Sequence, residues 1–130
     1  MSLNNPLANV LSFIQNYERL GKKEVLTKNN SNLIKKVLII MNKEGYIGSF
    51  EEIEDNKGDL LKINLIGKIN NINVIRPSYQ IKNVEFEKFE KRYLPAKDFG
   101  IIIVSTNKGL MTHQEAKEKG YGGKLLAYCY

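Results

Sequence analysis

The chain has 130 residues, of which 42% are hydrophobic, a size that suits one compact domain or two small lobes and excludes a large multidomain enzyme. No apolar run approaches the roughly 20 residues of a membrane span, and the first residues lack the basic and apolar regions of a signal peptide. We therefore expect a soluble, cytoplasmic protein without contact to a membrane. Cys129 is the only cysteine, which excludes an internal disulfide and a cysteine-rich zinc site.

The formal net charge of +6 is unevenly distributed along the chain. Residues 1–67 hold nine bases and eight acids, whereas residues 68–130 hold eleven bases and six acids. A surface that faces a polyanion is therefore expected mainly in the second half.

The first residues predict a helix followed by a short strand. Asn5 can cap and Pro6 can open a helix, which Gly21 ends. Residues 23–28 alternate enough for a strand that carries Val25 and Thr27. The apolar residues of the helix recur at the spacing of one face: Leu7, Val10, Leu11, Ile14 and Tyr17.

The next segment predicts a second helix and a hairpin. Ser31 caps the helix and Gly45 stops it, and the core stripe between them contains Ile34, Val37, Leu38 and Met41. Residues 47–54 form the first strand of the hairpin, and Asp55–Gly58 form its turn. The second strand carries Leu61, Ile63 and Leu65 on one face. The first lobe is thus predicted to run helix, strand, helix, strand, strand.

Gly67 marks the predicted boundary between an N-terminal α/β lobe, residues 1–67, and a C-terminal lobe, residues 68–130. Strand character resumes in residues 74–81, where Pro77 favours an edge strand or a bulge. Residues 84–94 predict a short surface helix stopped by Pro95.

The last third of the chain predicts a buried strand, a capped helix and a final strand. Residues 99–106 contain the β-branched run Ile101–Val104, typical of a strand buried on both faces. Thr112 and Glu115 form a capping box for a helix of about two turns that ends at Gly120. Residues 124–130 form the final strand. The predicted fold class is α+β in two small lobes, the second mainly an antiparallel sheet with short helices.

The most informative feature lies between the buried strand and the capped helix: Ser105, Thr106, Asn107, Lys108 and Gly109. Two hydroxyls and an amide at a fixed tip suit the base edges, 2′-hydroxyls and phosphates of RNA. An ordinary solvated connection would have the same composition, so the residues alone leave both interpretations open.

A second glycine cluster, Gly120–Lys124, could let the backbone approach a ligand closely. It is not a phosphate-binding P-loop, because the spacing of the motif is not met and Leu125 stands where a hydroxyl is needed. Asn107–Leu110 likewise does not complete a guanine-reading motif, since Leu110 cannot supply the carboxylate.

A small hydrolase or nucleotide-binding enzyme built on the Ser105–Gly109 turn is the alternative from another class. A hydrolase would combine Ser105, His113 and Asp98, but no G-x-S-x-G elbow surrounds Ser105. The capping pattern places His113 in the first turn of a helix, a position commonly exposed to solvent. We expect no enzyme, metal or cofactor. A general protein-interaction module is a third option, and its binding would survive high salt.

Basic residues interleave with aromatic residues at Arg76–Tyr79 and at Lys88–Tyr93. Stacking of a tyrosine on an unpaired base and neutralisation of phosphates would be the RNA-binding interpretation. Phe89 and Tyr93 fit a core stripe better, whereas Arg76 and Tyr79 are candidates for RNA contact.

Residues 100–117, Gly-Ile-Ile-Ile-Val-Ser-Thr-Asn-Lys-Gly-Leu-Met-Thr-His-Gln-Glu-Ala-Lys, resemble the signature of the universal small-subunit ribosomal protein eight family. The likeness extends over the whole chain. Residues 86–98 resemble the archaeal and eukaryotic members of the family rather than the bacterial ones. Further matching segments are Asn5–Ala8, Gly45–Gly48, Arg76–Pro77 and Gly122–Tyr128.

The resemblance implies a structural component of the small ribosomal subunit that binds the central domain of small-subunit rRNA early in assembly. Such a protein recognises an irregular RNA helix through its minor groove, mainly with the C-terminal lobe. It has neighbouring small-subunit ribosomal proteins as further partners and is expected to be a monomer off the ribosome.

Carried over by residue, the resemblance places Ser105 and Thr106 in the RNA-contacting turn and Gly122, Gly123 and Lys124 in the segment beside it. Asn107 stands where the family usually has Ser, which implies a longer, amide-based contact, and Lys108 completes the turn. The first helix is a further candidate contact through Asn16 and Arg19.

Overall fold

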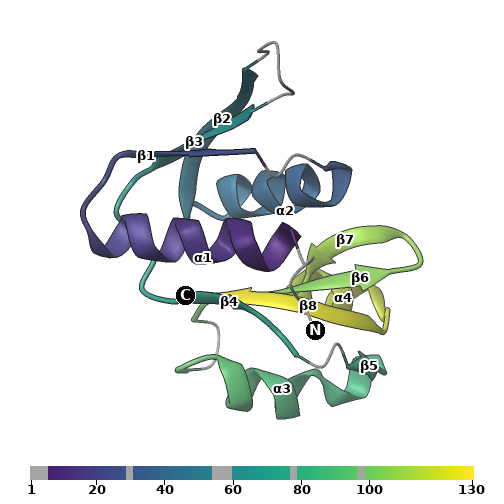
Figure 1. Cartoon of the computed structure of the whole chain (residues 1–130). Coiled ribbons are helices and arrows are strands. Elements are labelled where there is room, and N and C mark those ends of the chain that lie inside the picture. The colour runs from purple at the N-terminus through teal and green to yellow at the C-terminus, as the bar shows by residue number, and fades with distance from the viewer. Residues whose placement is uncertain (1–5, 29–30, 54–59, 77–78, 97–98) are drawn as a thin grey trace. The chain divides into compact units, whose positions relative to one another are not determined.

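The computed structural model describes residues 6–28, 31–53, 60–76, 79–96 and 99–130 (Figure 1). The fold is α+β, as predicted, and has two compact units, Met1–Ile69 and Asn70–Tyr130. Within the described ranges, no helix is long and apolar enough to cross a membrane.

The first unit has the predicted order of elements. Its strands form an antiparallel sheet in the order β1-β3-β2, and α1 and α2 lie along one side of that sheet (Figure 1). In chain order the elements are α1 (Pro6–Arg19), β1 (Glu24–Thr27), α2 (Asn32–Lys43), β2 (Ile47–Ile53) and β3 (Leu60–Leu65).

Local signals in the sequence account for most of these helix ends and faces. The Ser31 hydroxyl accepts a hydrogen bond from the Ile34 N–H at 3.3 Å, and Gly45 takes the positive φ that closes α2. Both predicted apolar stripes are buried, except that Tyr17 is 37% exposed. The predicted turn Asp55–Gly58 lies outside the described residues.

The second unit is a five-stranded antiparallel sheet with two helices. The strands follow the order β4-β8-β6-β7, and β5 also pairs with β8. The elements are β4 (Ile72–Val74), β5 (Gln80–Ile81), the 3-10 turn η1 (Asn83–Glu85), α3 (Phe86–Tyr93), β6 (Ile101–Thr106), β7 (Gly109–Thr112), α4 (His113–Lys119) and β8 (Gly123–Cys129).

Of the described residues in the strand predicted for residues 74–81, only Val74, at the end of β4, and Gln80–Ile81, which form β5, are in strands. Both short strands lie along the same side of β8. Pro77, which favoured an edge or a bulge, lies outside the described residues. The run Ile101–Val104 is fully buried, as predicted for a strand covered on both faces.

Helices α3 and α4 cover one face of this sheet and form a core with it. The core contains Ile75, Ile81, Phe86, Phe89, Leu94, Ile102, Val104, Met111, Ala116 and Leu125. Because β6 and β8 contribute to this core, the polar residues at their ends are held on a rigid base.

Candidate functional site

The segment after the buried strand is a tight β-hairpin, which corrects the prediction of a five-residue connection. β6 and β7 pair from Ile103 opposite Thr112 to Thr106 opposite Gly109, so only Asn107 and Lys108 form the turn. Gly109 has a φ of +110°, which a residue with a side chain rarely adopts. Thr112 is both the last residue of β7 and the N-cap of α4, where its hydroxyl accepts from the Glu115 N–H.

The Thr106 hydroxyl closes this turn from within. It donates a hydrogen bond to the Gly109 carbonyl at 2.9 Å and accepts one from the Lys108 N–H at 3.0 Å. A hydroxyl has one proton and two lone pairs, so Thr106 retains one lone pair for an external donor. Its main contribution is therefore to fix the positions of Asn107 and Lys108.

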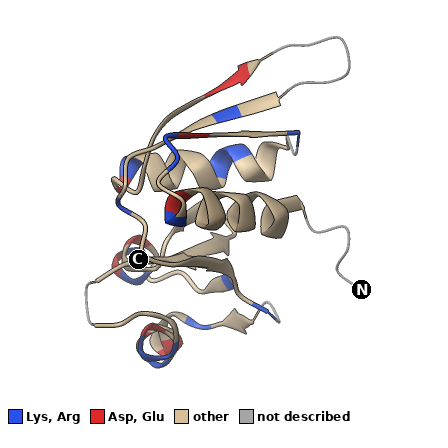
Figure 2. Ribbon diagram, turned by 60° about the vertical axis from the view of Figure 1, so that its left-hand side comes forward, with Lys and Arg blue, Asp and Glu red and all other residues tan. Residues whose placement is uncertain are grey.

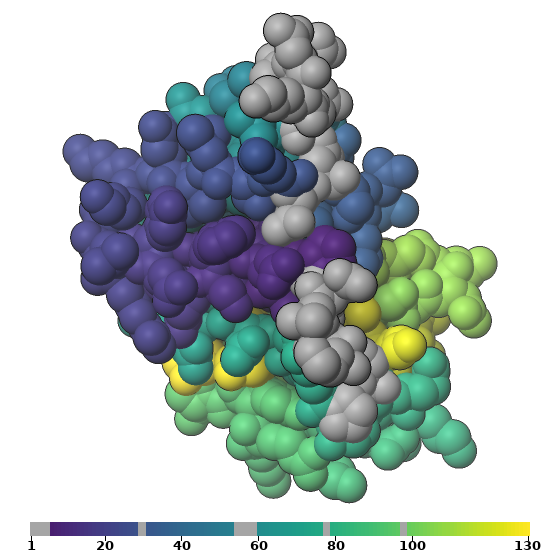
Figure 3. All heavy atoms as spheres, in the orientation of Figure 1, coloured from purple at the N-terminus to yellow at the C-terminus, as the bar shows by residue number. Residues whose placement is uncertain are grey.

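A row of polar side chains crosses the sheet beside the hairpin. Ser105 on β6 lies opposite Lys124 on β8, and Lys124 lies opposite Gln80 on β5. Directly opposed residues of antiparallel strands project from the same face. Ser105 is half-buried, whereas Lys124 and Gln80 are exposed. The yellow-green hairpin and the yellow atoms of β8 are both visible at the surface of this unit (Figure 3).

Gly122 and Gly123 allow the strands of this row to approach closely. A Cβ on Gly123 would lie 2.4 Å from the Ser105 carbonyl oxygen and 2.8 Å from Val104 Cγ1. A Cβ on Gly122 would lie 2.5 Å from the Ile81 carbonyl oxygen. The packing of neighbouring strands therefore requires both glycines, and the approach of a ligand to this segment stays a prediction.

A shallow hollow of about 270 Å³ joins the turn to the segment before β8. Its lining contains Asn107, Lys108, Gly120, Tyr121 and Gly122. Tyr121 was not among the predicted site residues. Its ring is half-buried against the core, and its backbone N–H donates to the Ala116 carbonyl at the end of α4. The sequence signal that could have identified Tyr121 is an aromatic residue between two glycines, Gly120 and Gly122.

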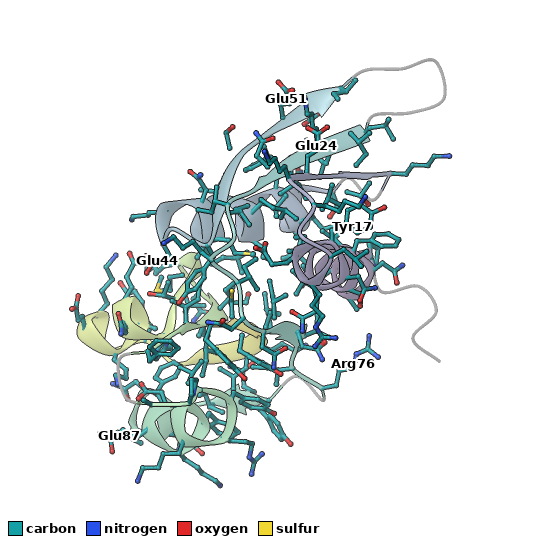
Figure 4. The ribbon with its side chains drawn as sticks, turned by 90° about the vertical axis from the view of Figure 1, so that its left-hand side faces the viewer. Tyr17, Glu24, Glu44, Glu51, Arg76 and Glu87 are labelled. Carbon is teal, nitrogen blue, oxygen red and sulfur yellow. The ribbon has the colours of Figure 1, made fainter. Side chains whose placement is uncertain are left out.

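Tyr79 and Arg76 differ in what they offer to a ligand. The Tyr79 ring packs against Phe89 with the ring centroids 5.2 Å apart, and Arg92 Nη1 donates to its hydroxyl at 3.4 Å. Tyr79 is thus held on α3 and is not an open platform. Arg76 is exposed and extends away from its ribbon (Figure 4). In the first unit, Asn16 is exposed on α1.

His113 is buried, 1% exposed, although its place at the start of a helix suggested exposure. Its Nδ1 accepts a hydrogen bond from the Ile102 N–H at 3.1 Å, and its Nε2 lies 3.4 Å from Glu90 Oε1. Glu90 Oε1 also accepts a hydrogen bond from Lys117 Nζ at 2.5 Å. Because Ile102 and Glu90 occupy its nitrogens, His113 is not arranged as a base for Ser105. Asp98, the third member of the hydrolase alternative, lies outside the described residues.

The model of the family described as ribosomal protein S8 matches residues 5–130. The chain belongs to the ribosomal protein S8 family. S8 proteins are a family of structural ribosomal proteins and not an enzyme family. Among the residues that the structure describes, no group of three or more His, Cys, Asp or Glu side chains could hold a metal ion.

Proposed function

We propose that this S8 protein binds the central domain of small-subunit rRNA through the β6–β7 hairpin and the start of β8, and that it helps the subunit to assemble. The observation that carries the proposal is the register of Ser105 opposite Lys124, directly beside the Asn107–Lys108 turn. A hydroxyl, an amide and two lysine side chains thereby project from fixed backbone positions at one end of a packed sheet.

These groups match the chemistry of an RNA minor groove. The groove presents 2′-hydroxyls and base edges, which the Ser105 hydroxyl and the Asn107 amide can both donate to and accept from. Lys108 and Lys124 can neutralise phosphates on either side of the groove. The Thr106 hydroxyl, already donating to Gly109, can accept from one 2′-hydroxyl.

The hollow beside the turn suits an unpaired base. Tyr121 provides an aromatic surface, and the Asn107 amide lies on the same lining. Stacking on a tyrosine places few demands on base identity, whereas an amide can read a base edge. Irregular RNA helices contain such unpaired bases, which an uninterrupted duplex does not offer.

Arg76, Tyr79 and Asn16 are proposed as secondary contacts. Arg76 is exposed and can reach a phosphate, while the packing of Tyr79 on Phe89 limits it to its polar edge. Asn16 would contact RNA from the first unit. The protein would act in the cytoplasm, as a monomer before it joins the subunit and its neighbouring small-subunit proteins.

A filter-binding titration tests the proposal. The intact protein is titrated against an irregular helix from the central domain and against a random hairpin of equal length. We expect nanomolar-class binding to the first, much weaker binding to the second, and a loss of affinity with salt set by a few neutralised phosphates. Equal affinity for the two RNAs would contradict the proposal, and binding that survives high salt would favour a protein-interaction module.

A further inference from the structure

A second surface feature of the C-terminal unit lies at the end of α3. A cavity of about 400 Å³ is lined by Glu87, Glu90, Lys91, Leu94, Pro95 and Ala96. α3 carries both signs of charge along its length, as the red and blue segments of its ribbon show (Figure 2). Among the residues that the structure describes, two carboxylates and three apolar side chains line the cavity, and Lys91 is the one cation.

Glu90 is the unusual member of this lining because it is a carboxylate only 8% exposed. Its contacts with Lys117 and His113 both use Oε1. The other oxygen, Oε2, takes part in neither contact and can accept from a further donor. Glu87, one helical turn earlier, is exposed and points away from α3 (Figure 4). Residues three apart on a helix are neighbours, so a single ligand can reach both carboxylates.

The cavity is separate from the proposed RNA surface. His113, which contacts Glu90, is bonded to Ile102 at the start of β6, whereas the hairpin turn follows the end of that strand. Five residues of strand between Ile102 and Asn107 span about 16 Å. The two features can therefore be occupied at the same time by different partners.

We propose that this cavity receives an arginine side chain from a neighbouring protein of the small subunit. The guanidinium would pair with Glu87 and with Glu90 Oε2, and its aliphatic stem would lie along Leu94, Pro95 and Ala96. Arginine suits such a site because its planar fork reaches two carboxylates and its guanidinium is more weakly hydrated than an ammonium group. RNA suits it less, because the exposed Glu87 carboxylate repels phosphates.

Photo-crosslinking within assembled subunits tests the assignment. Ala96, which is exposed in the lining, is replaced by benzoylphenylalanine in the full-length protein, small subunits are purified, and crosslinked peptides are identified by mass spectrometry. We expect a crosslink to a ribosomal protein within a few residues of an arginine. A crosslink to rRNA, or none to any protein, would overturn the proposal.

Charge reversal shows whether the carboxylate attracts the partner. Glu87→Lys should lower the crosslink yield by about tenfold, whereas Glu118→Lys, an exposed glutamate on α4 outside the lining, should leave it unchanged. Exchanging the charges, with Glu87→Arg in this chain and arginine to glutamate in the partner, should restore the yield. The ion pair would be refuted if Glu87→Lys and Glu118→Lys lowered the crosslink yield equally. It would also be refuted if the exchanged charges did not restore the yield.

Discussion

Ser105 on β6 and Lys124 on β8 lie opposite each other, and the Ser105 carbonyl oxygen fills the space that a side chain on the preceding residue, Gly123, would need. The close approach of the two strands therefore sets the spacing between the backbone positions that carry a hydroxyl and a lysine side chain. Each of these groups makes a different and measurable contribution to RNA binding.

Replacing Ser105 and Lys124 separately should distinguish hydrogen bonding from phosphate neutralisation. Lys124→Ala should lower the slope of log affinity against log salt by about one, because one fewer phosphate is neutralised. Ser105→Ala should cost on the order of 1 kcal/mol and leave the slope unchanged. Filter binding at several salt concentrations measures both quantities. The control is Lys43→Ala, at an exposed lysine on α2. If this variant changes the salt slope as much as Lys124→Ala does, Lys124 does not neutralise a specific phosphate.

Gly123→Ala should destabilise the fold even in the absence of RNA. The new methyl group would meet the Ser105 carbonyl oxygen at 2.4 Å, and backbone atoms in a packed sheet cannot move aside cheaply. We expect a loss of about 1–3 kcal/mol in the free energy of unfolding, measured by urea titration. Gly48→Ala is the matched control, because its Cβ would meet the Asn64 side chain at 3.2 Å. If both variants are equally stable, the close strand packing at Gly123 is not a constraint.

Local sequence signals predicted most of the fold, and long-range pairing accounts for what they did not. The caps at Ser31 and Thr112 and the buried run before Ser105 depend on residues near in sequence, and all three are confirmed. β7 was missed because it has four residues and passes directly into α4 without a turn signal. Its strand conformation depends on pairing with β6.

In the candidate site, too, features that depend on neighbouring residues were predicted, and features that depend on distant residues were not. Ser105, Asn107 and Lys108 were identified as polar residues between a buried strand and a capped helix, and the resemblance to a family signature then favoured RNA contact. The structure places Lys124 opposite Ser105. The burial of His113 could not be predicted, since its partners Ile102 and Glu90 belong to other elements. RNA contact by any of these residues stays a prediction.

His113→Leu tests whether this histidine serves the fold. Leucine fills similar space but leaves the Ile102 N–H without its acceptor and removes the ring beside Glu90. We expect a loss on the order of 2–4 kcal/mol in unfolding free energy, because two buried polar groups lose a partner. Gln114→Leu, at the next position of α4, is the control. A variant that keeps its stability but loses RNA binding would assign His113 to the interface instead.

Glu18 on α1 makes the stability of the fold depend on pH. Its Oε2 is buried and has no hydrogen-bond partner among the described residues. Burial raises the pKa of the Glu18 carboxyl above the ordinary value of 4.5, and a hydrogen bond from the Gly67 backbone opposes this only in part. The folded state therefore favours the protonated form.

Glu18→Gln should stabilise the protein at pH 7 but not at pH 4. Below pH 4.5 the carboxyl is protonated in both states, and as the pH rises through the higher folded pKa, ionisation costs more in the folded state. The wild type thus loses stability over this interval, and the neutral amide does not. Urea unfolding at both pH values gives the difference between variant and wild type. Glu51→Gln, at an exposed glutamate on β2, controls for the lost charge. A gain from Glu18→Gln that does not depend on pH would point to packing rather than ionisation.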